Sequence, residues 1–226
     1  HLIGGIDYQL SRDTKLTLEA FNKEYFNAPV LPAANNVGDR SYVLDNAGAF
    51  YEFLEDDGRA YARGVEMLIQ KKLAVNFYGM FSASYFRTRY RDFNGEELNR
   101  NFDNRYLLSF IGGYRPNDVW ELSLRWTMLG GRPNTPADIA ASDAANTLIL
   151  DQAQFNSDRL PAYHSLFVRA DRRFFFRQTN MVVFLEIWNV YNNHNVRQEF
   201  WNVVDRRVDE ISQFSFLPVS GIKFEF

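Results

Sequence analysis

The sequence predicts an all-β fold, a portion of an antiparallel transmembrane β-barrel built from about nine strands. Three observations support this prediction. Polar and apolar residues alternate with a period of two, the connections alternate between short and long, and 16% of the 226 residues are aromatic while 23% are charged. A barrel wall accommodates both classes, because rings can face lipid while charges face a wet interior.

The clearest alternation lies in residues 119–129. One face of a strand there would carry Trp120, Leu122, Leu124, Trp126 and Met128. The other face would carry Glu121, Ser123, Arg125 and Thr127. A helix would scatter these charges around its circumference, whereas a strand separates them completely.

Eight further segments repeat the pattern less regularly and are also predicted to be strands. In chain order they are 2–10, 16–21, 59–72, 76–90, 105–115, 163–173, 181–191 and 212–226. The segment 105–115 is apolar on both faces, so its orientation stays open. The charges predicted to face the interior and to form cross-strand ladders are Glu66, Glu121, Arg125, Arg169, Asp171, Glu186, Lys223 and Glu225. The orientation of Glu186 also stays open.

The connections alternate strictly in length. The short ones are 11–14, the region of Leu73 and Ala74, 116–118 and 177–179, whereas the long ones are 27–58, 91–104, 131–160 and 192–211. Short periplasmic turns and long extracellular loops are typical of outer-membrane barrels. Phe226 would then lie at the periplasmic rim and His1 at the extracellular rim. Because complete barrels have an even number of strands, we expect further strands upstream of His1.

Neither the composition nor the motifs favour a catalytic, metal-binding or nucleic-acid-binding function. The chain has no cysteine and a net charge of -3, so neither disulfides nor a strong field toward nucleic acid is expected. No metal-ligand spacing or glycine-rich phosphate loop is present. His164 and Ser165 adjoin along a predicted strand and would point to opposite faces, so they cannot form a nucleophile–base pair. We therefore expect no catalytic residue, no metal, no cofactor and no enzymatic activity.

The end of the chain carries a glycine followed by two aromatic residues, Gly221, Phe224 and the terminal Phe226. This tail resembles the signal that outer-membrane barrels present to their insertion machinery. Val219 departs from the polar residue expected at its first position. Physically, the rings suit the membrane interface and the free strand edge is available for pairing. An ordinary final strand that ends in phenylalanine is the alternative.

Six stretches resemble the C-terminal barrel of TonB-dependent receptors in their order and spacing. They are 63–67, 102–105, 130–133, 160–164, 189–192 and 221–226. Each stretch alone has little specificity for the family, and the resemblance depends on the ordered set. Phe167 stands where that family often has aspartate, so it does not serve as an anchor.

The resemblance implies that residues 1–226 are the C-terminal portion of a barrel of about 22 strands, with the plug domain and the upstream strands absent. Such receptors lie in the bacterial outer membrane and take up scarce nutrients of the iron-siderophore, cobalamin or oligosaccharide class. The implied partners are outer-membrane lipid, the barrel-insertion machinery, TonB through the missing plug region, and an extracellular small-molecule or oligosaccharide ligand.

Three other classes stay open. A passive outer-membrane porin or channel would share this wall and lack a plug, so the residues preceding His1 would discriminate. An outer-membrane enzyme would usually be a small and complete barrel, and the odd number of predicted strands conflicts with this. A soluble β-sandwich would bury Trp120 and Trp126 against a second sheet.

The long loops supply the candidate ligand contacts, because loop tips escape the packing constraints of the wall. The aromatic rings suit stacking and the arginines suit an anionic ligand. The candidates are Tyr42, Phe50, Tyr51 and Phe53 in the first loop and Phe200, Trp201, Arg206 and Arg207 in the last. For each residue the alternative is packing between loops or solvation. The acidic run 55–57 lacks the ligand spacing of a known calcium loop and is interpreted as a solvated turn.

Overall fold

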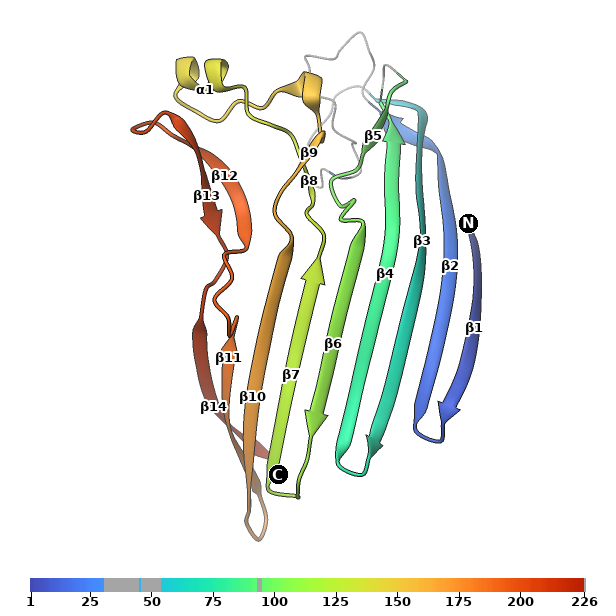
Figure 1. Ribbon diagram of the computed structural model, residues 1–226, viewed down its shortest axis with the longest axis vertical. Coiled ribbons are helices and arrows are strands. Elements are labelled where there is room, and N and C mark those ends of the chain that lie inside the picture. The colour runs from blue at the N-terminus through green and yellow to red at the C-terminus, as the bar shows by residue number, and fades with distance from the viewer. Residues whose placement is uncertain (31–44, 46–53, 93–94, 226) are drawn as a thin grey trace.

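The computed structural model describes residues 1–30, 45, 54–92 and 95–225, and within them one antiparallel sheet dominates (Figure 1). Its nine main strands follow one another in the order β1-β2-β3-β4-β6-β7-β10-β11-β14, and the sheet does not close on itself. Every neighbouring pair is antiparallel, as the hairpin rhythm of the sequence predicts.

Each predicted strand corresponds to one main strand of the sheet. The strands are β1 (Leu2–Ser11), β2 (Thr14–Val30), β3 (Glu55–Ala74), β4 (Phe77–Arg91), β6 (Tyr106–Tyr114), β7 (Trp120–Leu129), β10 (Tyr163–Phe175), β11 (Asn180–Trp188) and β14 (Leu217–Glu225). β2 and β3 extend well beyond their predicted ends into the first long loop. The last strand begins at Leu217, because Ser212 belongs to a separate hairpin.

The short turns lie together at one end of the strands, here called the short-turn edge of the sheet, and the C-terminal end of the chain lies there too (Figure 1). The β3–β4 turn differs from its prediction. It consists of Val75 and Asn76, which both have positive φ angles (48° and 77°), whereas Leu73 and Ala74 are the last two residues of β3. A positive φ is common for asparagine and unusual for the β-branched valine, so local sequence does not mark this turn.

The opposite edge carries an additional layer that the sequence did not predict (Figure 1). It contains a short strand β5 (Glu97–Asn99) beside β4, a ribbon of β8 (Pro133–Asn134) and β9 (Asp158–Arg159), and a hairpin of β12 (Val196–Asn202) and β13 (Arg207–Ser212). The loop between β7 and β10 also contains the helix α1 (Ile139–Ala145) and the 3-10 helix η3 (Gln152–Gln154). Asp138 and Asp151 cap these two helices by accepting hydrogen bonds from backbone N–H groups. No helix in the described part of the chain is long and apolar enough to cross a membrane.

The sheet has two chemically different faces. Residues directly opposite one another in the register share a face, which assigns every position in the sheet. One face, here called the charged face, carries all eight predicted charges, Glu66, Glu121, Arg125, Arg169, Asp171, Glu186, Lys223 and Glu225. The other, here called the apolar face, carries Leu18, Met67, Phe81, Phe110, Leu122, Leu124, Trp126, Leu185, Ile222 and Phe224. The register thus resolves the open orientation of Glu186.

The fold has little conventional core. The buried apolar cluster consists of Ala28, Ala60 and Tyr90, with Leu98 and Phe155 packed against it. Large apolar side chains stay exposed along the apolar face, among them Leu122 at 48% and Leu124 at 38%. A soluble sandwich would cover these residues with a second sheet, and the described residues contain none on this face.

Candidate functional site

The charged face carries a connected set of ion pairs near the edge with the short turns. Glu121 on β7 accepts a hydrogen bond from Tyr78 Oη (2.6 Å) and pairs with Arg115 (2.8 Å) and with Arg173 on β10 (3.5 Å). Four segments of the sheet therefore meet at one carboxylate. Such a ladder fixes the strand register while leaving its groups able to face water.

A second set lies beside it on β10 and β11. Arg169 pairs with Asp171 (2.6 Å) and approaches Glu186 (3.7 Å), and its guanidinium lies 3.9 Å from the centre of the Phe184 ring. Arg125 lies in the same way over Phe167, at 4.3 Å. Phe167 thus supports a charged side chain on this face.

Toward the other edge, a buried ion pair joins two long connections. Asp103 has a side chain that is 1% exposed and pairs with Arg159 at 2.6 Å. The second Asp103 oxygen accepts the backbone N–H of Thr88 on β4 (2.7 Å), and Arg159 donates to the carbonyl oxygen of Gly131 (2.8 Å). Because both charges are largely removed from water, the pair holds the β7–β10 loop firmly against the top of β4.

This network also brings together three of the stretches that resemble the receptor family. Asn104 donates to the carbonyl oxygen of Gly130 at 2.7 Å. A Cβ atom on Gly131 would lie 1.8 Å from the Leu160 carbonyl oxygen, so only glycine fits there. The stretches 102–105, 130–133 and 160–164 therefore act in loop attachment.

The β7–β10 loop then crosses above the charged face. Asn156, which follows η3, donates to the carbonyl oxygen of Asn99 on β5 (2.8 Å) and to the side chain of Asn101 (3.0 Å). Phe155 packs against the buried cluster of Ala28, Ala60 and Tyr90, of which Ala60 and Tyr90 lie on the charged face. The loop thus covers the far end of that face rather than extending away from the sheet.

The β12–β13 hairpin approaches the same region from the other side. Glu199 accepts a hydrogen bond from Asn134 on β8 (2.9 Å), and Arg132 donates to the carbonyl oxygen of Arg197 (3.1 Å). Arg206 lies 3.5 Å from Asp143 of α1. The two long connections therefore form one layer.

The structure places the predicted ligand contacts of the last loop in different surroundings. Phe200 is 37% exposed and the side chain of Arg206 is 74% exposed, whereas Trp201 is only 6% exposed and lies within the layer. Arg207 pairs with Asp209 at 2.7 Å and with Asp205 at 3.4 Å. Tyr42, Phe50, Tyr51 and Phe53 lie outside the described residues.

The tip of the hairpin is fixed by one side chain. Asn202 accepts hydrogen bonds from the backbone N–H groups of Val204 and Asp205 (3.0 and 3.1 Å) and donates to Asp209 (2.6 Å). This arrangement holds Arg206 at a positive φ of 51° and directs the chain back into β13. The Asn202 amide and the Arg207 guanidinium together hold the pKa of Asp209 below its ordinary value.

Between the hairpin and the sheet lies a cavity of about 330 Å³. Its lining includes Arg132, Tyr163, Arg197 and Gln213 together with the backbone near Gly130. Neither Arg132 nor Arg197 has an ion-pair partner within the described part of the chain. Sequence reasoning missed both arginines as ligand contacts. Arg132 entered it only as part of the stretch 130–133, and Arg197 stands in a polar loop with no motif around it.

Two residues of the predicted assembly signal are described. Gly221 lies on the charged face beneath the Phe184 ring, where a Cβ would come within 2.6 Å of it, and Phe224 lies on the apolar face and is 56% exposed. Phe226 lies outside the described residues. Among the residues that are described, no group of three or more potential ligands is arranged to hold a metal ion.

Comparisons with known proteins give a match at the level of structure. No family model and no curated protein matches the sequence. The structure matches the ferric-catecholate import receptor Fiu of Escherichia coli K12 over 99% of this chain, with a TM-score of 0.61 and 11% identity. It also matches the ferric yersiniabactin uptake receptor FyuA of Yersinia pestis over 98% of this chain, with a TM-score of 0.56 and 15% identity.

The chain has the fold of a TonB-dependent receptor barrel. It spans 27% and 28% of the length of the two receptors, so its sheet corresponds to part of their barrel. In a barrel of this kind the apolar face is the outer wall and the charged face lines the interior. The layer of loops then lies over one mouth of the receptor-like barrel.

Proposed function

We propose that the protein is an outer-membrane receptor that takes up a scarce, bulky nutrient in a TonB-dependent manner. Residues 1–226 form the C-terminal portion of its barrel, with the loop layer outside the cell and the short turns in the periplasm. The observation that carries this proposal is the combination of the receptor-like sheet with a loop layer that covers the charged face. A passive pore needs no such layered mouth, because it discriminates by width.

Among the nutrient classes, an anionic ferric chelate suits the cavity best. Arg132 and Arg197 line it without carboxylate partners in the described part of the chain. Guanidinium groups bind carboxylate and catecholate oxygens through paired, charge-assisted hydrogen bonds. Arg206 and Phe200 lie on the same hairpin and extend this surface toward the solvent. A neutral oligosaccharide would leave both cavity arginines uncompensated.

The test is growth of a strain that lacks the gene, with ferric catecholate as the only iron source. Arg197→Gln should raise the concentration needed for half-maximal growth about tenfold, because one charge-assisted contact is lost. Arg12→Gln in the periplasmic turn between β1 and β2 is the matched control and should behave as the unmodified protein does.

Energy coupling separates the receptor from a passive channel. Uptake should disappear in a strain without TonB. Uptake that persists there, with the same dependence on concentration, would identify the protein as a passive channel and overturn the proposal.

A further inference from the structure

The apolar face changes character abruptly at one level of β3 and β4. Val65 and Tyr85 stand opposite each other and end the apolar part of this face. The next pair on the same face is Arg63 opposite Arg87. Beyond it come Arg89, opposite Tyr61, and then Arg59 opposite Arg91. Five arginines are thereby gathered on the outer side of two adjacent strands.

Two of these pairs place like charges directly opposite one another, which destabilises an antiparallel sheet. Internal compensation is partial. Arg63 approaches Glu24 (3.5 Å) and donates to Asn22 (2.8 Å). Glu97 of β5 stands opposite Arg91 on this face and hydrogen-bonds Tyr61. Within the described residues Arg59, Arg87, Arg89 and Arg91 have no ion pair, and Arg89 Nε is buried without a hydrogen-bond partner. Glu55 and Asp57 lie further along β3, beyond Arg59.

The level of the arginines matches a membrane boundary. Arg87 stands ten residues from Phe77, where β4 leaves the short-turn edge. At about 3.3 Å per residue and a strand tilt of about 40°, this distance is about 25 Å along the barrel axis, the height of the apolar band of an outer-membrane barrel. The Arg63–Arg87 pair would therefore lie at the polar headgroups of the extracellular leaflet.

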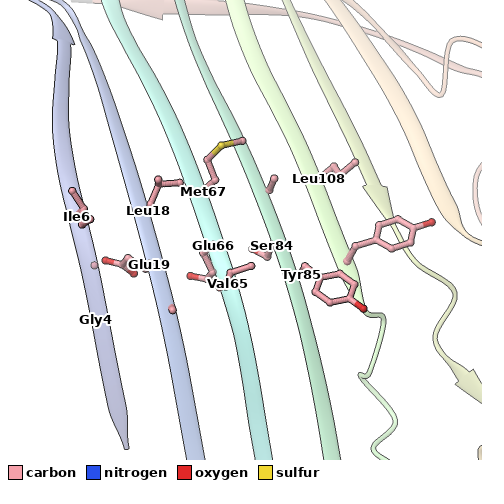
Figure 2. Close-up of a pocket in the computed structure, with 14 residues that line it drawn as sticks. Gly4, Ile6, Leu18, Glu19, Val65, Glu66, Met67, Ser84, Tyr85 and Leu108 are labelled. Carbon is pink, nitrogen blue, oxygen red and sulfur yellow. The ribbon is translucent and has the colours of Figure 1, made fainter.

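Directly next to the Arg63–Arg87 pair, the apolar face contains a groove of about 760 Å³. Figure 2 shows Ile6, Leu18, Met67 and Leu108 on β1, β2, β3 and β6, with Val65 and Tyr85 beside them. Ala83 of β4 stands between Met67 and Leu108 in the register. Small residues at Gly4, Ala20 and Ala83 make the hollow, and a Cβ on Gly4 would meet no atom within 4 Å. Its lining is almost entirely apolar, so the groove suits hydrocarbon chains.

We propose that this surface binds one phosphorylated lipid of the extracellular leaflet. The arginines hold its phosphate groups, and the groove receives its acyl chains. The inference rests on the outer-membrane location given under the proposed function. Arginine suits phosphate because its planar guanidinium forms paired hydrogen bonds with two oxygens, and a bound phosphate relieves the repulsion within both arginine pairs.

The experiment uses the protein purified in detergent and reconstituted into nanodiscs of phosphatidylcholine with a minor fraction of phosphatidic acid. Lipid that stays bound through delipidating washes is then identified by native mass spectrometry. The unmodified protein should retain phosphatidic acid in preference to phosphatidylcholine. The Arg63→Gln/Arg87→Gln variant should retain about tenfold less. Lys23→Gln is the matched control, because Lys23 lies in the neighbouring register row but on the charged face, and it should retain as much as the unmodified protein.

A second variant tests the groove separately. Gly4→Phe fills the hollow without a steric clash at its Cβ, and it should lower retention while leaving all five arginines in place. An excess of inorganic phosphate should not displace the lipid. Displacement by phosphate alone, with Gly4→Phe unchanged, would identify a free-anion site and overturn the lipid proposal.

The remaining outcomes separate this inference from the proposed function. Equal retention by all variants, in a protein that inserts normally into membranes, would overturn the lipid site alone. A protein that fails to insert would instead contradict the outer-membrane location itself.

Discussion

Leu124 is the position at which the two-faced wall can be tested energetically. It lies near the middle of β7, on the apolar face, between Gly112 of β6 and Val168 of β10. Neither neighbour can pair with a charge. Leu124→Arg should therefore lower the free energy of unfolding from the bilayer by about 2–4 kcal/mol, the cost of a guanidinium near the membrane midplane.

Ser123→Arg is the matched control, one residue away on the charged face. Its new guanidinium would face water beside Arg169, which already pairs with Asp171 at 2.6 Å. The cost should be about 1 kcal/mol or less, from like-charge proximity alone. Leu124→Met keeps an apolar chain of similar volume and should cost less than about 1.5 kcal/mol.

The assay is unfolding by guanidinium chloride in phosphatidylcholine vesicles, followed by tryptophan fluorescence. The unfolding midpoints should rank Leu124→Arg lowest by a clear margin. Equal losses at positions 123 and 124, or a larger loss at 123, would refute the assignment of the faces.

Three further predictions concern the loop layer and the chain end. Asp103→Asn should lower the free energy of unfolding by about 3 kcal/mol, because it leaves Arg159 charged and unpaired. It should also make the β7–β10 loop susceptible to limited proteolysis. Arg206→Gln changes a side chain that is 74% exposed and should produce neither effect. The pKa of Asp209 is lowered in the folded hairpin. The ionised carboxylate therefore stabilises the hairpin fully above the ordinary aspartate pKa, and this stabilisation is lost as the pH falls through the pKa of the folded state. Hydrogen exchange of β12 and β13 should accordingly rise at acidic pH, and Asp209→Asn should remove that dependence. Deletion of Phe226 should slow membrane assembly in cells more than it lowers the stability of the folded barrel, and unchanged insertion would remove the assembly-signal interpretation.

The wall could be predicted from sequence because its determinants are local. A period of two along ten residues separates Trp120 and Leu122 from Glu121 and Ser123 whatever their partners are. Register adds what the sequence left open, namely which face carries Glu186 and how the nearly apolar strand β6 is oriented.

The loop layer could not be predicted because its contacts are distant in sequence. Asp103 and Arg159 stand 56 residues apart, and nothing in either surrounding segment indicates the other. The β12–β13 hairpin turns at Arg206, a residue that rarely adopts a positive φ. The cavity arginines, Arg132 and Arg197, are brought together only once this hairpin has docked on β8.

The most direct test of the two-faced wall is a scan of single cysteines along β7. The chain has no cysteine of its own, so each spin label reports one position. In bilayers, labels at positions 122 and 124 should be accessible to oxygen dissolved in lipid, and labels at 123 and 125 to a water-soluble nickel chelate. An absent alternation, or one of opposite phase, would contradict the placement of lipid on one side of this sheet and water on the other.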